Sequence, residues 1–370
     1  MSDKPIFVVK PNLPPLEDFI PYLREIWDNE WLTNCGPMHQ RLESELAEFL
    51  GVPFICLFNN ATNALMVALK ALEVAGEVIT TPYSFIATSH SILWNGSQPV
   101  FIDIDPNTLN MDPSKIEAAI TDKTTAIMPV HCYGTPCDVD AIDVIARKHN
   151  LKVIYDAAHA FAVDCHCGSV LNHGDLSILS FHATKVFNTF EGGAIICQNA
   201  EMKKRIDLLK NFGIQDEVTV TEVGMNGKMA EVNAAFGLLQ LKTIRKSIEK
   251  RKSIAEQYQR ELAGIAGIRY VQANVQAKLN YGYFPILVGD DYSLSRDALY
   301  ELLKQNGIFA RRYFYPLLSD FPMYSHLPST SRANLPVAAN AADRVLCLPM
   351  YASLSESDAL RVSGLIRSFA

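Results

Sequence analysis

The chain has 370 residues, of which 49% are hydrophobic and 20% are charged. Because this length exceeds the size at which one hydrophobic core usually stops growing, we expect two domains. The 33 basic and 40 acidic residues give a net charge of −7, which disfavours a nucleic-acid or anionic-membrane surface. A local site for a small anion remains compatible with this charge.

Residues 1–6 lack the apolar core of a secretion signal, and no uninterrupted apolar run is long enough to span a bilayer. We therefore expect a cytoplasmic protein that keeps its eight cysteines reduced. Cysteines and histidines cluster at 131–137 and 165–167, but without the Cys-x-x-Cys spacing of structural zinc sites. In an extended segment Cys165 and Cys167 would point to opposite sides, so we predict no metal site.

The first predicted helix covers residues 38–50. It places Met38, Leu42 and Leu46 at helical spacing, and Gly51 ends it. The preceding segment 31–37 has turn formers and no periodicity, which predicts a loop.

Residues 54–58 predict a buried strand that stops at a polar turn, and an apolar helix follows over 64–72. Such a turn leaves free backbone N–H groups at the positive end of the helix dipole, which together bind phosphate. Plain capping of the helix by Asn60 or Thr62 explains the same pattern.

Strand and helix signals then alternate along the chain. The helix expected over 138–149 begins with the capping residue Asp138 and ends with basic residues, as the helix dipole favours. This alternation predicts an α/β fold with a mostly parallel sheet that binds ligands at the carboxyl ends of its strands. Further strands are expected over 77–81, 99–104, 126–130, 152–156, 176–181 and 194–197.

Two of these strands lead to side chains that are candidates for catalysis. The nearest lysine to Asp156 is Lys152, at the opposite end of the same predicted strand. A buried carboxylate is costly without a cationic partner, which a cofactor nitrogen would supply. Capping of the next turn is the alternative for Asp156. Lys185 follows the next strand, and apolar surroundings would lower its pKa and free a nucleophilic amine. A solvated loop lysine is the ordinary alternative.

Pyridoxal 5′-phosphate needs a phosphate-binding helix start, a carboxylate for its ring nitrogen and a lysine for its aldehyde. The helix start at Thr62 suits its phosphate, Asp156 suits its ring nitrogen, and Lys185 suits its aldehyde as a Schiff base. Phe85 or His159 could pack on the faces of its flat ring.

With these residues in place, the chain resembles the DegT/DnrJ group of pyridoxal-phosphate-dependent nucleotide-sugar aminotransferases, within the aspartate aminotransferase fold (fold type I). The resemblance covers essentially the whole chain. Its motifs are LTNCGP at 32–37, ATNAL at 61–65, TPYSF at 81–85, VFIDID at 100–105, HCYG at 131–134, DAAHA at 156–160, SFHATK at 180–185 and GMNGKM at 224–229.

The resemblance implies that Lys185 binds the cofactor aldehyde, that Asp156 pairs with the ring nitrogen, and that Phe85 and His159 flank the ring. The phosphate contacts it implies are Ala61, Thr62 and Ser180, with Asn226 reaching in from the second subunit of a homodimer.

His182 and Tyr313 are the candidate substrate contacts. Tyr313 belongs to the segment 313–317, which resembles the family's stretch near the sugar-nucleotide site. An aromatic side chain that only packs the small domain is the alternative for Tyr313.

The implied architecture is a large domain over 1–263, with an N-terminal arm and a seven-stranded, mostly parallel sheet flanked by helices, and a small α+β domain over 264–370. Residues 229–262 predict one long helical stretch between the two. Beyond residue 263 no catalytic signature is visible.

The expected reaction moves the amino group of L-glutamate to the keto carbon of a nucleotide-linked sugar. The FEGG segment at 190–193 resembles members that aminate C4 of a 4-keto-6-deoxyhexose. We therefore expect conversion of dTDP-4-keto-6-deoxy-D-glucose to dTDP-4-amino-4,6-dideoxy-D-glucose for O-antigen or related glycan synthesis. The alternatives are C3 amination, a non-catalytic regulator that binds the cofactor and, with least support, a zinc-binding interaction module.

Overall fold

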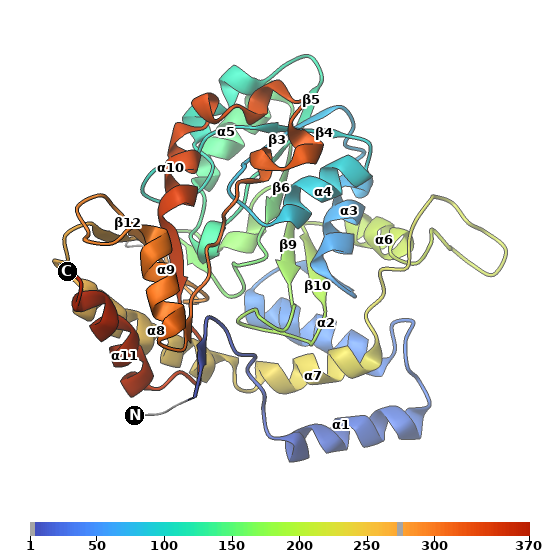
Figure 1. The fold of residues 1–370 in the computed structure, drawn as a ribbon. Coiled ribbons are helices and arrows are strands. Elements are labelled where there is room, and N and C mark those ends of the chain that lie inside the picture. The colour runs from blue at the N-terminus through green and yellow to red at the C-terminus, as the bar shows by residue number, and fades with distance from the viewer. Residues whose placement is uncertain (1–3, 272–276) are drawn as a thin grey trace.

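The computed structural model describes residues 4–271 and 277–370, and a seven-stranded sheet forms its centre (Figure 1). In spatial order the strands are β2 (Phe54–Phe58), β10 (Gly193–Cys197), β9 (Leu176–Ser180), β6 (Lys152–Asp156), β5 (Thr124–Met128), β3 (Glu77–Thr80) and β4 (Gln98–Phe101). Strand β10 is antiparallel to both neighbours, whereas the pairs from β9 to β4 are parallel. The predicted α/β fold with a mostly parallel sheet of seven strands is confirmed.

Helices cover both faces of this sheet because successive side chains of a strand point to opposite sides. In β10, Ala194 and Ile196 face one hydrophobic core and Ile195 faces the other. The helices on the first face are α1 (Leu16–Asn29), α2 (Pro37–Leu50), α5 (Val139–His149) and α7 (Glu231–Leu241), and those on the second are α3 (Ala61–Ala71), α4 (Ile86–Trp94) and α6 (Ala200–Leu209).

A smaller antiparallel sheet lies in the C-terminal part. Its strands are β11 (Ile268–Tyr270), β12 (Phe284–Val288) and β14 (Val345–Leu348), which share a core with α8 (Ile244–Leu262), α9 (Arg296–Gln305) and α11 (Glu356–Arg367). The boundary expected near Gly264 falls between α8 and β11, and the division into two domains stays a prediction.

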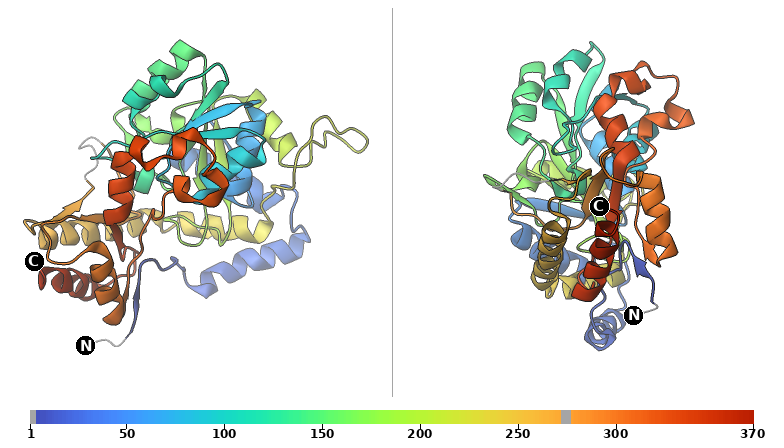
Figure 2. Two further views of the ribbon diagram at one scale, coloured as in Figure 1. Left: turned by 45° about the horizontal axis from the view of Figure 1, so that its top comes forward. Right: turned by 60° about the vertical axis from the view of Figure 1, so that its left-hand side comes forward.

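The N-terminal arm joins this C-terminal part. Strand β1 (Ile6–Phe7) pairs in parallel with β13 (Ile308–Phe309), which places this strand near the C-terminal helices (Figure 2). At the other end of the molecule, the carboxylate of Asp103 accepts the backbone N–H groups of Val337 and Ala338 at 2.9 and 2.8 Å. These bonds cap α10 (Pro336–Arg344) and attach it to the large sheet.

One expectation about local structure is wrong, and the condition attached to another is not met. Residues 229–262 form two helices, α7 and α8, because the N–H of Thr243 donates to the carbonyl of Gln240 at 3.1 Å, a three-residue turn in place of a helical bond. Residues 164–169 are not one extended strand but a tight hairpin of β7 (Asp164–Cys165) and β8 (Gly168–Ser169). The turn brings the sulfur atoms of Cys165 and Cys167 to 3.2 Å, where an extended segment would have separated them.

Short 3₁₀ turns connect several of these elements. They are η1 (Pro113–Lys115), η2 (Glu117–Ala119), η3 (Cys132–Gly134), η4 (Val170–Asn172), η5 (Leu318–Asp320), η6 (Pro322–Tyr324), η7 (Pro328–Thr330) and η8 (Arg332–Asn334). Within 4–271 and 277–370, no helix is long and apolar enough to cross a membrane.

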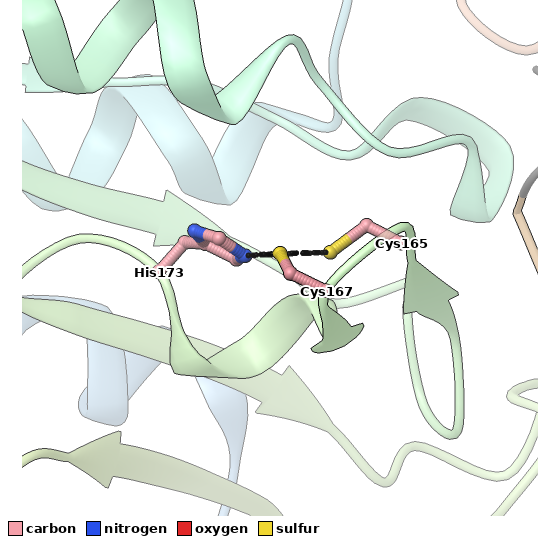
Figure 3. Close-up of side chains that lie close together, drawn as sticks. All are labelled: Cys165, Cys167 and His173. Carbon is pink, nitrogen blue, oxygen red and sulfur yellow. Dashed lines mark hydrogen bonds between the residues drawn. The ribbon is translucent and has the colours of Figure 1, made fainter.

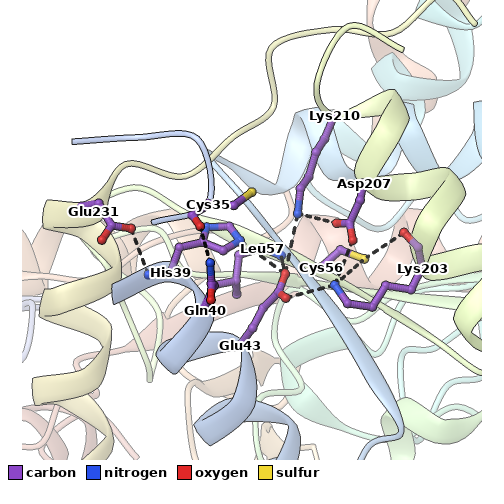
Figure 4. A network of polar contacts seen from close by, with 10 residues as sticks. All are labelled: Cys35, His39, Gln40, Glu43, Cys56, Leu57, Lys203, Asp207, Lys210 and Glu231. Carbon is purple, nitrogen blue, oxygen red and sulfur yellow. Dashed lines mark hydrogen bonds and ion pairs between the residues drawn. The ribbon is translucent and has the colours of Figure 1, made fainter. Parts of the chain in front are cut away.

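An ion-pair network joins α2 to the end of α6 (Figure 4). The carboxylate of Glu43 lies 3.0 Å from the ammonium of Lys203 and 3.6 Å from that of Lys210, and it contacts the ring of His39 at 3.3 Å. Burial alone would raise the pKa of Glu43, but the hydrogen bond from His39 and the charges of Lys210 and Lys203 lower this pKa to about 2.

We predict that Glu43→Gln destabilises the protein by about 3 kcal/mol at neutral pH, because it breaks a largely buried ion pair. A lowered folded-state pKa means that the charge stabilises the fold above the ordinary value of 4.5 and loses this effect as the pH falls towards about 2. Urea unfolding at several pH values measures the difference. It should shrink over that range, whereas the control Glu45→Gln, in an exposed pair with Arg41, should change stability by less than about 1 kcal/mol. Equal losses in both variants would contradict the prediction.

Candidate active site

A cavity of about 750 Å³ opens where strands β6 and β9 end and helix α3 begins. Residues from the C-terminal part, including Tyr283 and Arg311, close another side of it. Of the predicted site residues, those that line the cavity are Ala61, Thr62, Phe85, Asp156, His159, Ser180, His182, Lys185 and Tyr313. The structure therefore brings together all of them except Asn226.

Lys185 lies in the loop after β9 and is partly buried in this cavity, so it is not a solvated loop lysine. Its ammonium donates a hydrogen bond to the hydroxyl of Tyr283 at 3.1 Å. Burial lowers the pKa of Lys185 from 10.5 to about 8, although the nearby carboxylate of Asp156 acts in the opposite direction. At pH 7 about a tenth of the Lys185 side chains are therefore free amines, a few hundredfold more than at the ordinary pKa of 10.5.

The carboxylate of Asp156 is 5% exposed at the end of β6. One oxygen accepts the hydroxyl of Thr88 at 2.7 Å and the other accepts the backbone N–H of Ala158 at 3.1 Å. Burial raises the pKa of Asp156, and these two bonds and the charge of Lys185 oppose the shift. The bond from Ala158 is the local capping contact that the alternative expects. Both donors are neutral, so the carboxylate can still accept a hydrogen bond from a cation.

Helix α3 begins beside the cavity. The side chain of Asn60 caps it by accepting the N–H of Asn63 at 2.8 Å, so the capping alternative holds for this residue. The N–H groups of Ala61 and Thr62 come first in the helix, where intrahelical acceptors are lacking. Strand β10 starts very close to them. A Cβ atom on its first residue, Gly193, would lie only 2.7 Å from the nitrogen of Ala61, so a larger side chain does not fit there. Anion binding and capping therefore coexist at this helix end.

Two predicted ring contacts differ in their surroundings. The ring of His159 is stacked with that of Phe314, at 5.9 Å between centroids and 5° between planes, and its Nδ1 accepts the N–H of Tyr133 at 3.2 Å. Burial lowers the pKa of His159 well below its ordinary value, so the ring is neutral. Phe85 precedes α4 and is 59% exposed at the cavity.

The two candidate substrate contacts also line the cavity. The backbone carbonyl of Tyr313 accepts hydrogen bonds from the hydroxyls of Tyr83 and Tyr133, and its ring meets that of Tyr283 edge-on at 6.0 Å. Tyr313 thus packs against other aromatics and faces the cavity as well. The ring of His182 is exposed and lies 2.8 Å from the hydroxyl of Thr184.

A family model described as the DegT/DnrJ/EryC1/StrS aminotransferase family matches residues 16–367. The chain belongs to the DegT/DnrJ/EryC1/StrS aminotransferase family. It is therefore an enzyme and an aminotransferase, as the resemblance implies.

Similar proteins place this aminotransferase more closely. A dTDP-4-amino-4,6-dideoxy-D-glucose transaminase from Shigella dysenteriae is 60% identical over 353 residues, which cover 95% of this chain and 96% of the relative. A transaminase of the same name from Escherichia coli is 56% identical over 367 residues, or 99% of each chain. Among solved structures, DesI in the presence of its TDP-sugar product has a TM-score of 0.94 and 34% identity, covering 99% of this chain and 93% of its own.

Asn226 of this aminotransferase lies outside the cavity of its own chain. Its backbone carbonyl accepts the side-chain amide of Asn59 at 3.2 Å, at the base of the loop between α6 and α7. This loop projects away from the body of the molecule (Figure 1). The expected role of Asn226 in a second subunit stays a prediction.

Three residues of the site were missed at the level of sequence. Thr88 lies in the middle of α4, where a threonine carries no signal of function. Tyr283 and Arg311 come from the part of the chain in which no catalytic signature is visible, and only the fold brings them to Lys185. Of the described residues that line the cavity, Lys185 and Arg311 are the lysine and arginine side chains.

We predict that Thr88→Val lowers the transamination rate about ten- to a hundredfold, because it removes a hydrogen bond to a charged, buried carboxylate. The fold should persist, which urea unfolding checks. The matched control is Ser91→Ala on the same helix, where the lost hydroxyl donates only to a helical carbonyl at 2.9 Å. A Thr88→Val enzyme as fast as this control would show that Thr88 does not position Asp156.

We also predict the pH dependence of covalent cofactor attachment. Only the free amine of Lys185 attacks an aldehyde, so the attachment rate of pyridoxal 5′-phosphate to the apoenzyme should rise with pH through a midpoint near 8. Visible absorbance after rapid mixing follows the reaction, and Lys185→Ala should give no covalent product. A midpoint near the ordinary lysine value of 10.5 would contradict the lowered pKa.

Proposed function

We propose that this aminotransferase moves the amino group of L-glutamate to C4 of dTDP-4-keto-6-deoxy-D-glucose and forms dTDP-4-amino-4,6-dideoxy-D-glucose. The observation that carries this proposal is the 60% and 56% identity, over nearly the whole chain, to two transaminases with that product in their names. The FEGG segment at 190–193, two residues of which line the cavity, supports C4 over C3.

The residues of the cavity fit pyridoxal 5′-phosphate. The buried carboxylate of Asp156 has neutral donors and can hold the proton of a pyridinium nitrogen, while the first amides of α3 and the hydroxyl of Ser180 can bind a phosphate. The flat, neutral ring of His159 and the exposed ring of Phe85 can pack on the two faces of a planar group. When bound, this cofactor supplies an aldehyde that reacts with amines and a ring that withdraws electrons.

Lys185 then has two roles in the proposal. Its amine, freed by the lowered pKa, would hold the aldehyde of the bound cofactor and would be released when glutamate binds. The released amine removes the proton from the α-carbon of glutamate as a general base and returns a proton as a general acid. In the second half-reaction the same amine delivers a proton to C4 of the sugar. A pKa of about 8 suits both directions of transfer near neutral pH.

Substrates meet the cavity on the side closed by the C-terminal part. Arg311 lines the cavity, and the central carbon of its guanidinium lies 5.5 Å from the centroid of the Tyr313 ring. The guanidinium can bind an anionic group of glutamate or of the nucleotide. Tyr313 and His182 also line the cavity and supply polar groups to a bound substrate. These contacts support an anionic, hydroxyl-rich substrate.

We further propose that the enzyme works as a homodimer in which Asn226 completes the partner's site. The projecting loop that ends near Asn226 supports this arrangement (Figure 1). A cytoplasmic location and the use of the product in O-antigen or related glycan synthesis belong to the same proposal.

The test is the product itself. Holoenzyme is incubated with L-glutamate and either dTDP-4-keto-6-deoxyglucose or its 3-keto isomer, and the product is examined by NMR. We predict an amine on C4 from the 4-keto sugar and little turnover of the 3-keto isomer. Preferred amination of C3 would overturn the proposal.

Glutamate alone provides a control for the first half-reaction. It should bleach the visible absorption of the holoenzyme and release one 2-oxoglutarate per active site. Lys185→Ala should form no amino sugar while it retains its secondary structure and melting temperature. Turnover in that variant at the wild-type rate would exclude Lys185 as the proton carrier.

A further inference from the structure

A second cluster of reactive side chains lies away from the active-site cavity. The sulfur atoms of Cys165 and Cys167 and the Nε2 atom of His173 are close enough to form a small triangle of ligand atoms, and Figure 3 shows the three side chains next to one another. The two sulfurs are 3.2 Å apart, and the nitrogen lies 3.3 Å from Cys165 and 3.2 Å from Cys167. All three side chains therefore turn to one point, and none of them lines the cavity that contains Lys185.

The local fold produces this triangle from residues that are close in sequence. Cys165 ends β7, Cys167 lies in the hairpin turn, and His173 follows the 3₁₀ turn η4. The N–H of Val170 donates to the carbonyl of Val163 at 3.1 Å, which folds the chain after the hairpin back onto its start. This backbone bond fixes the position of His173 opposite the two thiols.

We propose that Cys165, Cys167 and His173 bind a Zn²⁺ ion. Two thiols and an imidazole are ligands that zinc prefers over harder cations such as magnesium or calcium. A tetrahedral ion about 2.3 Å from each sulfur and about 2.0–2.1 Å from the nitrogen needs ligand atoms about 3.5–3.8 Å apart. The three atoms occupy one face of such a tetrahedron after each pair separates by about 0.3–0.6 Å.

The fourth position of the ion faces solvent, because Cys167 is exposed and Cys165 and His173 are only partly buried. We assign it to a water molecule. Two other polar groups of the hairpin have partners: the carbonyl of Gly168 accepts the thiol of Cys165 at 3.3 Å, and the ring of His166 lies 3.3 Å from the carboxylate of Asp140 on α5. A disulfide between Cys165 and Cys167 is the alternative. It would not explain why the ring of His173 contacts both sulfur atoms.

The ion would act on the segment between Asp156 and Ser180. This segment joins β6, which carries Asp156, to β9, which leads to Lys185. None of the residues in its two hairpin strands, β7 and β8, is buried. A metal that binds the folded segment stabilises it by mass action, since the ligands are dispersed in the unfolded chain. We therefore assign the zinc a structural role in the connection between the two strands.

The test measures zinc on the untagged full-length holoenzyme. After treatment with a chelator, the protein is titrated with Zn²⁺ in competition with a chromophoric indicator under reducing conditions. Wild type should bind one ion per chain. Cys165→Ser, Cys167→Ser and His173→Asn should each weaken binding more than the 10–100-fold that loss of an outer partner of a metal site costs.

The matched control is Cys35→Ser, which removes a partly buried cysteine that also lies beside a histidine, His39, but outside the triangle. It should bind zinc as wild type does. Zn²⁺ should also raise the melting temperature of wild type and of this control, and leave that of Cys165→Ser unchanged. These readouts do not depend on transamination.

Three results would overturn the proposal. The first is zinc binding in the three ligand variants that is as tight as in the control, and the second is no tight binding in wild type. The third is an intact mass, recorded without reductant, in which the purified chain has lost two hydrogen atoms while Cys167→Ser has not, because this would assign the pair to a disulfide.

Discussion

The carboxylate of Asp156 is the constraint on which the active site depends. A charge buried at the end of a strand is costly, and here only a hydroxyl and a backbone amide among the described residues donate hydrogen bonds to it. The parallel order of β6 and β9 brings the ends of both strands to one edge of the sheet, so Lys185 shares this environment. Helix α4 contributes Thr88 from the other side. Strand order, helix position and electrostatics thus converge on one carboxyl group.

Burial shifts the two central groups in opposite directions. It raises the pKa of Asp156 and lowers that of Lys185, so each group is nearer to its neutral form than it would be in water. Groups with pKa values displaced in this way are typical of acid–base catalysis. The neutral ring of His159 fits the same pattern, because a positive charge on this ring would be repelled by Lys185. Burial therefore shifts the pKa values of these groups more than ion pairs do.

Much of this arrangement could be predicted from the sequence, because the signals are local. The alternation of strands and helices defines the sheet, Asp156 ends the mostly apolar strand β6, and Lys185 follows the buried strand β9. Thr88 and Arg311 could not be predicted, since their roles depend on packing between distant segments. The break at Thr243 and the hairpin at Cys165 were also missed. A single turn decides each of them, and hydrophobic periodicity does not report on turns.

The pairing of β1 with β13 has a consequence for how the protein is made. Ile6 is synthesised long before its strand partner, Ile308, because most of the strands and helices of the described chain lie between the two. The large sheet, whose strands all lie between Phe54 and Cys197, can form before that point. The arm therefore waits unpaired while these strands fold, and its docking closes a loop that spans most of the described chain. A chain truncated before β13 would contain every strand of the large sheet and still leave β1 without its strand partner.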